Sequence, residues 1–381
     1  MTLNYLLEVY SVIAGVGWIG VIAYVLIGFK NIKNLPEQDF AATEPAVAVV
    51  IAVRNEEEDV EKALQSICNI KYSNYRIIVL NDRSTDSTGA ILARMKVKYP
   101  AINVVTIDAL PDGWLGKNNA LYQGYLQSTE EWMLFTDADI VFHPDALSKA
   151  MSYVAKHDLD HLTILPRTVS RSVILNSLLA TFALMLVLYI RPWDVRNPKR
   201  KAAMGVGAFN LVKRTAYEKA GTHAPISLRP DDDLKLGQLI KQAGLRSDVL
   251  SGKEYLTLEW YKTVRQFRDG LMKNSFSISN YKLSGAVLNV LATLICVVIP
   301  VPLMMISGNF PIQILGCAVI LFQMIYMELT SPNKWWYALM IPFAGALMAY
   351  IIMRAAIITL KQGGIYWRDS FYSLAELKRG S

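Results

Sequence analysis

Residues 9–29 contain no charged side chain, and the stretch is about long enough to cross a lipid bilayer. Glu8 precedes it, whereas Lys30 and Lys33 follow it. A cleaved signal peptide carries its positive charge before the apolar run, so this arrangement favours an uncleaved anchor. Because basic residues prefer the cytoplasmic side, we expect residues 1–32 to form a transmembrane anchor that leaves the next domain in the cytoplasm.

Composition supports a protein that combines membrane segments with a soluble domain. The chain is 53% hydrophobic and 19% charged, which is too apolar for an ordinary soluble domain and too charged for a bundle of spans. Its net charge of +7 fits cytoplasmic flanks that face anionic lipid. No basic stripe is interleaved with aromatic residues, so we expect the lipid bilayer, and no nucleic acid, as a partner. The three cysteines lack the spacing of a disulfide framework or a zinc site.

Three apolar stretches, about 284–306, 312–328 and 336–360, predict a C-terminal transmembrane region over residues 284–360, followed by a tail, 361–381. One span before the soluble domain and three after it would place the tail outside the cell. The tail contains four basic residues that prefer the cytoplasm: Lys361, Arg368, Lys378 and Arg379. One re-entrant or interfacial stretch would remove the conflict, and the number of true spans stays open. We expect a multi-pass protein of the cell membrane.

Residues 173–190 form another apolar run that is long enough to span the membrane. A span here would separate the acidic motif at 231–233 from Asp139 by the bilayer. Cationic residues also bracket the run on both sides: Arg167, Arg171 and Arg191. We therefore favour a helix that lies in the membrane interface.

Between residues 46 and 144, short apolar strands alternate with helical patterns, which predicts a parallel sheet. The predicted strands are 46–53, 75–80, 102–107 and a fourth that ends near Asp137. Ligands of such sheets bind beyond the carboxyl ends of the strands. Polar clusters follow three of the four strands, at Arg54–Glu56, Asn81–Asp82 and Asp137–Asp139. We expect one cytoplasmic α/β domain over residues 45–280.

Asp137 and Asp139 end a strand that otherwise contains buried residue types. A buried charge costs several kcal/mol unless it is paired or binds a metal, so the acids reach solvent at a turn or hold a cation. Carboxylate oxygens suit Mg²⁺ or Mn²⁺, which bridge diphosphates. The D-x-D pattern alone leaves both interpretations open.

Three further motifs combine charge with a helix start. Gly116 and Lys117 suit a phosphate, although a capped loop with a solvated lysine explains them equally. Three acids, Asp231–Asp233, exceed what a helix N-terminus needs, and one of them is a candidate general base. Arg265 and Arg268 form either a cationic clamp on a leaving diphosphate or a basic helix beside the membrane.

The remaining polar signals are weaker. The four histidines, His143, His157, His161 and His223, show no metal-ligand spacing, so we expect them at the surface or in turns. The sequence "GVGAFN" (205–210) is either a glycine loop that lines a pocket or an ordinary turn.

The order of these motifs resembles glycosyltransferase family 2, which has the GT-A fold. The resemblance covers residues 45–280 and the tail. The stretches "PDGWLGKNNAL" and "GGIYWRDSFYSL" are similar to the membrane-bound branch of ceramide glucosyltransferase-like and carotenoid (diaponeurosporenoate- or hydroxychlorobactene-type) enzymes. The resemblance implies an α/β, Rossmann-like domain with a mixed sheet, an N-terminal transmembrane anchor and C-terminal transmembrane helices.

The resemblance also implies roles for individual residues. Arg54, Glu56 and Asp82 would hold the uridine of a UDP-sugar, and Lys117 would approach the diphosphate. Asp137 would contact the nucleotide and Asp139 the metal, Mn²⁺ or Mg²⁺. Asp233 aligns with the catalytic base and Asp232 with the acid before it.

One position departs from the family pattern. Arg265 and Arg268 match its R-x-x-R motif, but Asp269 stands where a tryptophan is expected. This puts in doubt any stacking role at the acceptor and counts against a processive polysaccharide synthase. Trp367 and Arg368 belong to the tail motif, for which no role follows.

The implied reaction is an inverting transfer of a hexose, glucose by preference, to a hydroxyl or carboxyl of a membrane lipid such as a carotenoid, ceramide, sterol, hopanoid or diacylglycerol. A lone base suits a single displacement. The alternatives within the enzyme class are a polyprenyl-phosphate glycosyltransferase and a polysaccharide synthase. A non-enzymatic alternative, a membrane-anchored nucleotide-binding scaffold, would not require Asp233.

Overall fold

The computed structural model describes residues 3–36, 44–170, 172–331, 334–367 and 370–379. The chain forms two compact units. The α/β unit contains residues 32–169, 190–260 and 379–381, and the helical unit contains residues 1–31, 170–189 and 261–378. The segment 170–189 and residues 261–280, which the sequence analysis includes in one domain over 45–280, are thus grouped with the apolar helices.

A seven-stranded mixed sheet forms the centre of the α/β unit, in the order β3-β2-β1-β4-β8-β6-β9. The first four strands are parallel to their neighbours, whereas β8 runs antiparallel to both β4 and β6. The mixed α/β fold is therefore confirmed. The strands are β1 (Val47–Val53), β2 (Tyr75–Asp82), β3 (Ile102–Ile107), β4 (Trp132–Thr136), β6 (His161–Leu165), β8 (Asn210–Lys213) and β9 (Ser247–Ser251).

Side chains of β1 alternate between the two faces of this sheet. Val49 and Ile51 pack in one hydrophobic cluster, whereas Ala48 and Val50 pack in a second. Both faces of a central strand are thus covered, which explains why its sequence is a continuous apolar run. The covering helices are α2 (Val60–Cys68), α3 (Thr88–Lys98), α4 (Gly116–Leu126), α5 (Ala146–His157), α7 (Arg214–Lys219) and α8 (Asp232–Gln242).

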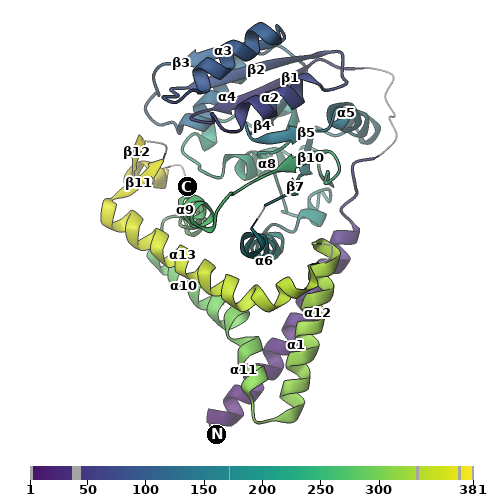
Figure 1. The fold of residues 1–381 in the computed structure, drawn as a ribbon, viewed down its shortest axis with the longest axis vertical. Helices are drawn as coiled ribbons and strands as arrows, with labels where there is room; N and C mark the ends of the chain where they lie inside the picture. The colour runs from purple at the N-terminus through teal and green to yellow at the C-terminus, as the bar shows by residue number, and fades with distance from the viewer. Residues whose placement is uncertain (1–2, 37–43, 171, 332–333, 368–369, 380–381) are drawn as a thin grey trace. The chain divides into compact units, whose positions relative to one another are not determined.

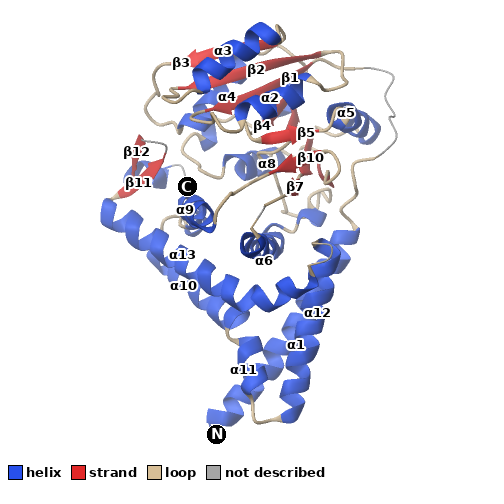
Figure 2. Cartoon of the chain, in the orientation of Figure 1, coloured by secondary structure: helices blue, strands red, loops and turns tan. Residues whose placement is uncertain are grey.

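A second, three-stranded sheet has the order β5-β10-β7. Its strands are β5 (Ile140–Phe142), β10 (Leu256–Leu258) and β7 (Arg167–Thr168). Strand β5 follows Asp139 immediately, so the two acids of the D-x-D pattern lie in the turn between β4 and β5. Figure 2 shows the strands of both sheets in red.

The helical unit contains the apolar stretches of both chain ends. Helices α1 (Leu3–Lys30), α11 (Pro300–Ile306) and α12 (Phe310–Thr330) pack side by side (Figure 1). The Trp18 indole N–H donates to the carbonyl oxygen of Cys296 over 2.8 Å, which ties α1 to the π-helical segment Leu294–Val298 before α11. Helix α10 (Leu283–Thr293) leads directly into this π-helical segment, and α13 (Ile341–Gln362) follows α12. Five helices in the described residues, α6 included, are long and apolar enough to cross a membrane.

Helices α6 (Val173–Ile190) and α9 (Val264–Ser275) pack against α13 through a buried cluster. The cluster contains Leu175, Leu178, Leu179, Phe267, Leu271, Ala344, Met348 and Ile351. Figure 1 shows α6 and α9 end-on, whereas α1 and α12 run along the page. This crossing supports the interfacial placement of residues 173–190, which stays a prediction. Arg171, one of the bracketing cations, lies outside the described residues.

The tail after α13 forms a hairpin of β11 (Gly364–Trp367) and β12 (Ser370–Ser373), followed by α14 (Leu374–Arg379). Tyr366 and Phe371 face each other across this hairpin with ring centroids 5.0 Å apart. Arg368 lies outside the described residues, as does the side chain of Trp367.

Candidate active site

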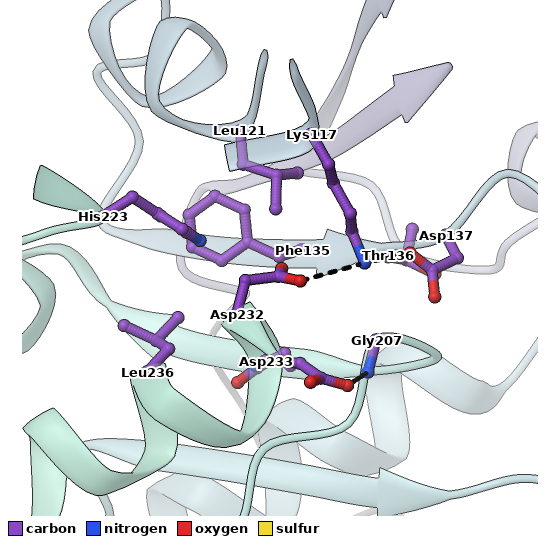
Figure 3. A pocket seen from close by; sticks show the side chains of 11 residues that line it. Lys117, Leu121, Phe135, Thr136, Asp137, Gly207, His223, Asp232, Asp233 and Leu236 are labelled. Atoms are coloured by element: carbon purple, nitrogen blue, oxygen red, sulfur yellow. Dashed lines mark hydrogen bonds and ion pairs between the residues drawn. The ribbon is translucent and has the colours of Figure 1, made fainter. Parts of the chain in front are cut away.

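A pocket opens where β4 and β8 meet the first turns of α4 and α8 (Figure 3). The β-sheet register explains this position, because Ile51 of β1 lies opposite Thr136 of β4 and Val53 opposite Asn81 of β2. The polar residues that follow these strands therefore emerge at one edge. The pocket is lined by Lys117, Leu121, Phe135, Thr136, Asp137, Gly207, Asn210, His223, Asp232, Asp233 and Leu236.

Lys117 points into this pocket and joins two of the acidic motifs. Its Nζ lies 2.8 Å from Asp137 Oδ1 and 3.6 Å from Asp232 Oδ1, and 28% of its side chain is exposed. Burial alone would lower the pKa of Lys117, but the surrounding carboxylates raise it above its usual value. The lysine is therefore a fixed positive charge between the D-x-D turn and the start of α8.

Asp233 is held by two backbone N–H groups at the start of α8. Gly207 N–H donates to Oδ2 and Leu234 N–H donates to Oδ1, each over 2.7 Å. Burial raises the pKa of Asp233, and Lys117 opposes that rise. A fixed carboxylate with a raised pKa has the properties required of a general base.

The other two acids of this motif differ from Asp233. Asp231 accepts two hydrogen bonds from the buried Arg229 guanidinium, over 2.9 and 3.0 Å, and is thereby committed to a structural ion pair. Asp232 is buried and faces Lys117. Burial raises the pKa of Asp232 to about 7, with Lys117 opposing and Asp233 adding to the rise.

The glycine loop before β8 lines the pocket. The Gly207 carbonyl accepts the Asp137 N–H over 2.9 Å, and its own N–H donates to Asp233. A Cβ at Gly207 would overlap the Asp137 carboxylate. Of the two interpretations of "GVGAFN", the structure therefore supports the close-approach loop.

Asp139 presents an unpaired oxygen in the turn after β4. Its Oδ1 is buried and has no hydrogen-bond partner in the described part of the chain. Burial, together with the charges of Asp137 and Glu56, raises the pKa of Asp139 to about 7. An orphaned carboxylate oxygen fits a hard divalent cation. The described residues contain no group of three or more acidic, histidine or cysteine side chains that could hold a metal ion.

Asp82 lies beside the first turn of α4. The Arg83 guanidinium donates to both of its oxygens, over 2.7 and 3.0 Å, and Arg54 Nη1 lies 3.8 Å away. Arg83, which the sequence analysis did not single out, is therefore the nearest cation to Asp82. Glu56 lies after β1, where its N–H donates to Thr88 Oγ1 over 2.9 Å. The nucleotide-binding roles of Arg54, Glu56 and Asp82 stay predictions.

Replacing Gly116 by Ala tests this packing. The new Cβ would overlap the Asp82 carboxylate and lie 2.9 Å from Arg83 Nη2. We expect a loss of about 2 kcal/mol in the free energy of unfolding and weaker nucleotide binding. Gly89→Ala in α3 is the matched control, because its Cβ would lie 3.7 Å from the nearest side chain, that of Asn81. Equal melting temperatures for the two variants would contradict the close approach.

Asn118 is a positioning residue that the sequence analysis missed. Its side-chain amide donates to the carbonyl oxygens of Ile226, Ser227 and Arg229, over 2.7, 3.1 and 2.9 Å. These bonds tie the first turn of α4, which carries Lys117, to the loop before the acidic motif. A polar asparagine at a buried helix position was the available signal.

Two histidines correct the expectation of surface positions. His161 and His223 are 0% and 1% exposed. His161 Nε2 lies 2.6 Å from Asn210 Oδ1, and burial lowers its pKa to about 4. The prediction was wrong for His161, which lies in β6, whereas His223 lies in a turn as expected but is buried there. The absence of metal-ligand spacing does not prevent a neutral imidazole from being buried with a hydrogen-bond partner.

Arg265 and Arg268 lie on α9 of the helical unit. Arg268 donates to both oxygens of Asp269, over 2.7 and 3.0 Å, and Arg265 Nε lies 3.9 Å from Asp269 Oδ2. The hydrogen bond from Arg268 is the main cause that lowers the pKa of Asp269. Asp269 thus pairs with both arginines at the position of the missing tryptophan. The diphosphate clamp stays a prediction.

Comparison with known proteins places this fold in a class. Residues 48–221 match the profile described as glycosyl transferase family 2. A mannosyltransferase (PcManGT) from Pyrobaculum calidifontis, solved with GDP-Man and Mn²⁺, superposes with a TM-score of 0.59 at 16% identity, covering 93% of this chain and 98% of that one. The fold is that of a GT-A glycosyltransferase.

Sequence relatives of this chain carry the name of a glycosyltransferase. The 4,4'-diaponeurosporenoate glycosyltransferase of Staphylococcus aureus strain USA300 is 26% identical over 236 residues, and the protein of strain MRSA252 gives the same values. The match spans 61% of this chain and 61% of the relatives' length. The chain carries a glycosyltransferase family 2 domain.

Proposed function

We propose that the protein is a membrane-bound, inverting hexosyltransferase. It transfers glucose from UDP-glucose to a hydroxyl or carboxyl group of a membrane lipid. The observation that carries this proposal is the backbone-held carboxylate of Asp233 in the same pocket as Lys117 and Asp137. The family 2 domain and the similarity to a diaponeurosporenoate glycosyltransferase support it.

Asp233 acts as the general base of a single displacement. It takes the proton of the lipid hydroxyl as that oxygen forms a bond to the anomeric carbon. The bond between this carbon and the diphosphate oxygen breaks on the opposite face, and its electron pair leaves with UDP. The two N–H donors from Gly207 and Leu234 keep the Asp233 carboxylate in one orientation during this step.

The remaining charges of the site bind the donor. Lys117 stabilises the negative charge that builds up on the leaving diphosphate, and Asp137 orients Lys117. Mn²⁺ or Mg²⁺, held by Asp139, supplies further charge neutralisation when it is bound. Arg54, Glu56 and Asp82 hold the nucleoside, as the sequence resemblance implies.

The apolar helices bring the enzyme to its second substrate. A UDP-sugar is soluble, whereas a lipid acceptor stays in the bilayer, so a lipid glycosyltransferase must work at the membrane surface. Five helices with the length and composition of spans support this localisation. Lys30 at the end of α1 and Lys33 after it favour a cytoplasmic position for the α/β unit of a cell-membrane protein.

The test uses purified full-length protein, Mn²⁺, a total lipid extract and labelled UDP-glucose, UDP-galactose or GDP-mannose. We expect one labelled lipid from UDP-glucose, identified by mass spectrometry, and transfer to a lipid alcohol about 1,000-fold slower with Asp233→Asn. A labelled lipid formed only from GDP-mannose would contradict UDP-glucose as the donor. A labelled polymer would indicate a polysaccharide synthase. No labelled product with any donor would refute the proposed function.

The pH dependence of kcat follows from the environment of Asp233. Burial raises the pKa of Asp233 above the ordinary carboxyl value of 3.8. The base must be ionised, so kcat should rise with pH along a limb whose midpoint lies above that value. Lys117→Met removes a charge that lowers this pKa, and should move the limb to higher pH. A limb that moves to lower pH in Lys117→Met would contradict the assignment.

A further inference from the structure

His223 is a pocket-lining residue with no role so far. Its side chain is 1% exposed and packs edge-on against Phe135, with ring centroids 5.1 Å apart. Figure 3 shows it entering the pocket from the side opposite Asp137. In the described part of the chain, Tyr217 is the partner of both its Nδ1 and its backbone N–H, and its backbone carbonyl accepts from Ile226 N–H over 3.1 Å. No described residue hydrogen-bonds to the other ring nitrogen, Nε2.

The hydrogen bonds around Tyr217 decide which ring nitrogen carries the proton. The His223 backbone N–H donates to Tyr217 Oη over 3.1 Å, so this oxygen acts as an acceptor. The phenol has one proton, and within the described residues the acceptor that it meets is His223 Nδ1, 2.5 Å away. Tyr217 is fully buried, so an unused O–H would be a desolvated donor. The phenol therefore donates to Nδ1, and the proton of the neutral ring lies on Nε2.

Burial keeps this ring neutral. Burial, with a smaller contribution from the charge of Lys117, lowers the pKa of His223 to about 3. Nε2 is thus an uncharged N–H donor at neutral pH. The other polar groups around the pocket include three carboxylates, Asp137, Asp232 and Asp233, which accept hydrogen bonds when they are ionised.

We propose that His223 binds the transferred hexose, by donating its Nε2 proton to one sugar hydroxyl oxygen, and thereby sets the preference for that hydroxyl's presence and configuration. A sugar hydroxyl both donates and accepts. The carboxylates take its proton, and a neutral donor is needed for its oxygen. The walls beside His223, formed by Leu121, Phe135 and Leu236, offer no such donor. The inference rests on the proposed function, since it assumes a nucleotide-sugar donor.

Kinetics with deoxy sugars test the contact. UDP-glucose and its 2-, 3-, 4- and 6-deoxy analogues are compared in wild-type protein, His223→Leu and His223→Gln. We expect one deoxy donor to lose about 100-fold in kcat/KM with the wild type. His223→Leu should lower kcat/KM for UDP-glucose by a similar factor. With that deoxy donor, its kcat/KM should be little lower than that of the wild type. His223→Gln, which keeps an N–H near the Nε2 position, should recover about 10-fold. If His223→Leu lowered kcat/KM by the same factor for UDP-glucose and for every deoxy analogue, the proposal would be overturned.

The tautomer is tested in the wild-type protein, so the result does not depend on a variant that folds. The chain has only four histidines, and His223→Gln assigns the resonance in ¹⁵N-histidine-labelled protein. We expect a pyrrole-type shift for Nε2 and a pyridine-type shift for Nδ1, with a change at Nε2 when UDP-glucose binds. Tyr217→Phe should abolish the preference for this tautomer. A protonated Nδ1 would overturn the assignment.

The two proposals fail in different ways. Absence of transfer from every nucleotide sugar would refute the proposed function while leaving the tautomer assignment to the spectrum. Transfer by the wild type without coupling between His223 and any hydroxyl would refute only the sugar contact. A thermal melt of each variant separates loss of folding from loss of the contact.

Discussion

Asp233→Asn is expected to lower kcat about 1,000-fold, with little change in the melting temperature. An amide cannot accept the acceptor's proton, and general-base catalysis contributes about 10²–10⁴-fold. The backbone N–H of Gly207 or Leu234 can still donate to the remaining amide oxygen, so the loop should keep its conformation. Initial rates with labelled UDP-glucose and a titration of UDP binding measure the two effects separately.

Asp231→Asn is the matched control two residues away. It removes the charge that pairs with the buried Arg229, which should cost about 3 kcal/mol in the free energy of unfolding. We therefore expect Asp231→Asn to lower the melting temperature far more than kcat, the reverse of Asp233→Asn. Full transfer to a lipid alcohol by Asp233→Asn would remove this residue as the base. Activity retained only with a carboxylic acid acceptor would instead fit the mechanism, because that acceptor is already ionised.

Asp139→Asn is expected to abolish activation by Mn²⁺ and at the same time to stabilise the metal-free protein. The pKa of Asp139 rises from 3.8 to about 7 on folding, so ionised Asp139 opposes folding increasingly as pH rises through this range. The neutral amide removes that opposition. We expect a gain of about 2 kcal/mol at pH 8 in the presence of chelator, after allowance for partial solvent screening, and a smaller gain near pH 5.

Thermal unfolding with and without Mn²⁺ measures this second prediction. In the wild type, chelation should reduce transfer at least about 100-fold, and Mn²⁺ should restore it and raise the melting temperature. In Asp139→Asn, neither the transfer rate nor the melting temperature should respond to Mn²⁺. Asp112→Asn, an exposed acid in the loop before α4, is the control for loss of one negative charge. Unchanged transfer after thorough chelation would exclude the metal role of Asp139.

The parallel half of the sheet could be predicted from sequence because each of its strands is a local apolar run, such as 75–80, followed by polar residues. Strands β6, β8 and β9 were not predicted. These strands pair with neighbours that are far away in the sequence. For example, β8 pairs with β4, although α5 and α6 lie between the two strands along the chain. The antiparallel position of β8 between β4 and β6 depends on tertiary structure, and the local hydrophobic periodicity of the sequence does not indicate it.

The charged part of the candidate site was also accessible from sequence, because Lys117, Asp137 and Asp233 each follow a strand or open a helix. Its neutral part was not. Asn118 and His223 act through hydrogen bonds whose partners lie on other elements or six residues away. The distinction between Asp231 and Asp233 likewise required the Arg229 guanidinium and the Gly207 N–H to be placed.

The route of the chain between its two units has a practical consequence for protein production. The α/β unit is discontinuous, since residues 170–189 leave it to join the helical unit before the chain returns. Cutting the chain at residues 32 and 260 would therefore retain α6 while removing Phe267, Leu271 and Met348, against which its leucines pack. Such a fragment would aggregate without detergent. A soluble catalytic fragment requires a short polar linker in place of residues 170–189, with its ends joined to Val169 and Ile190.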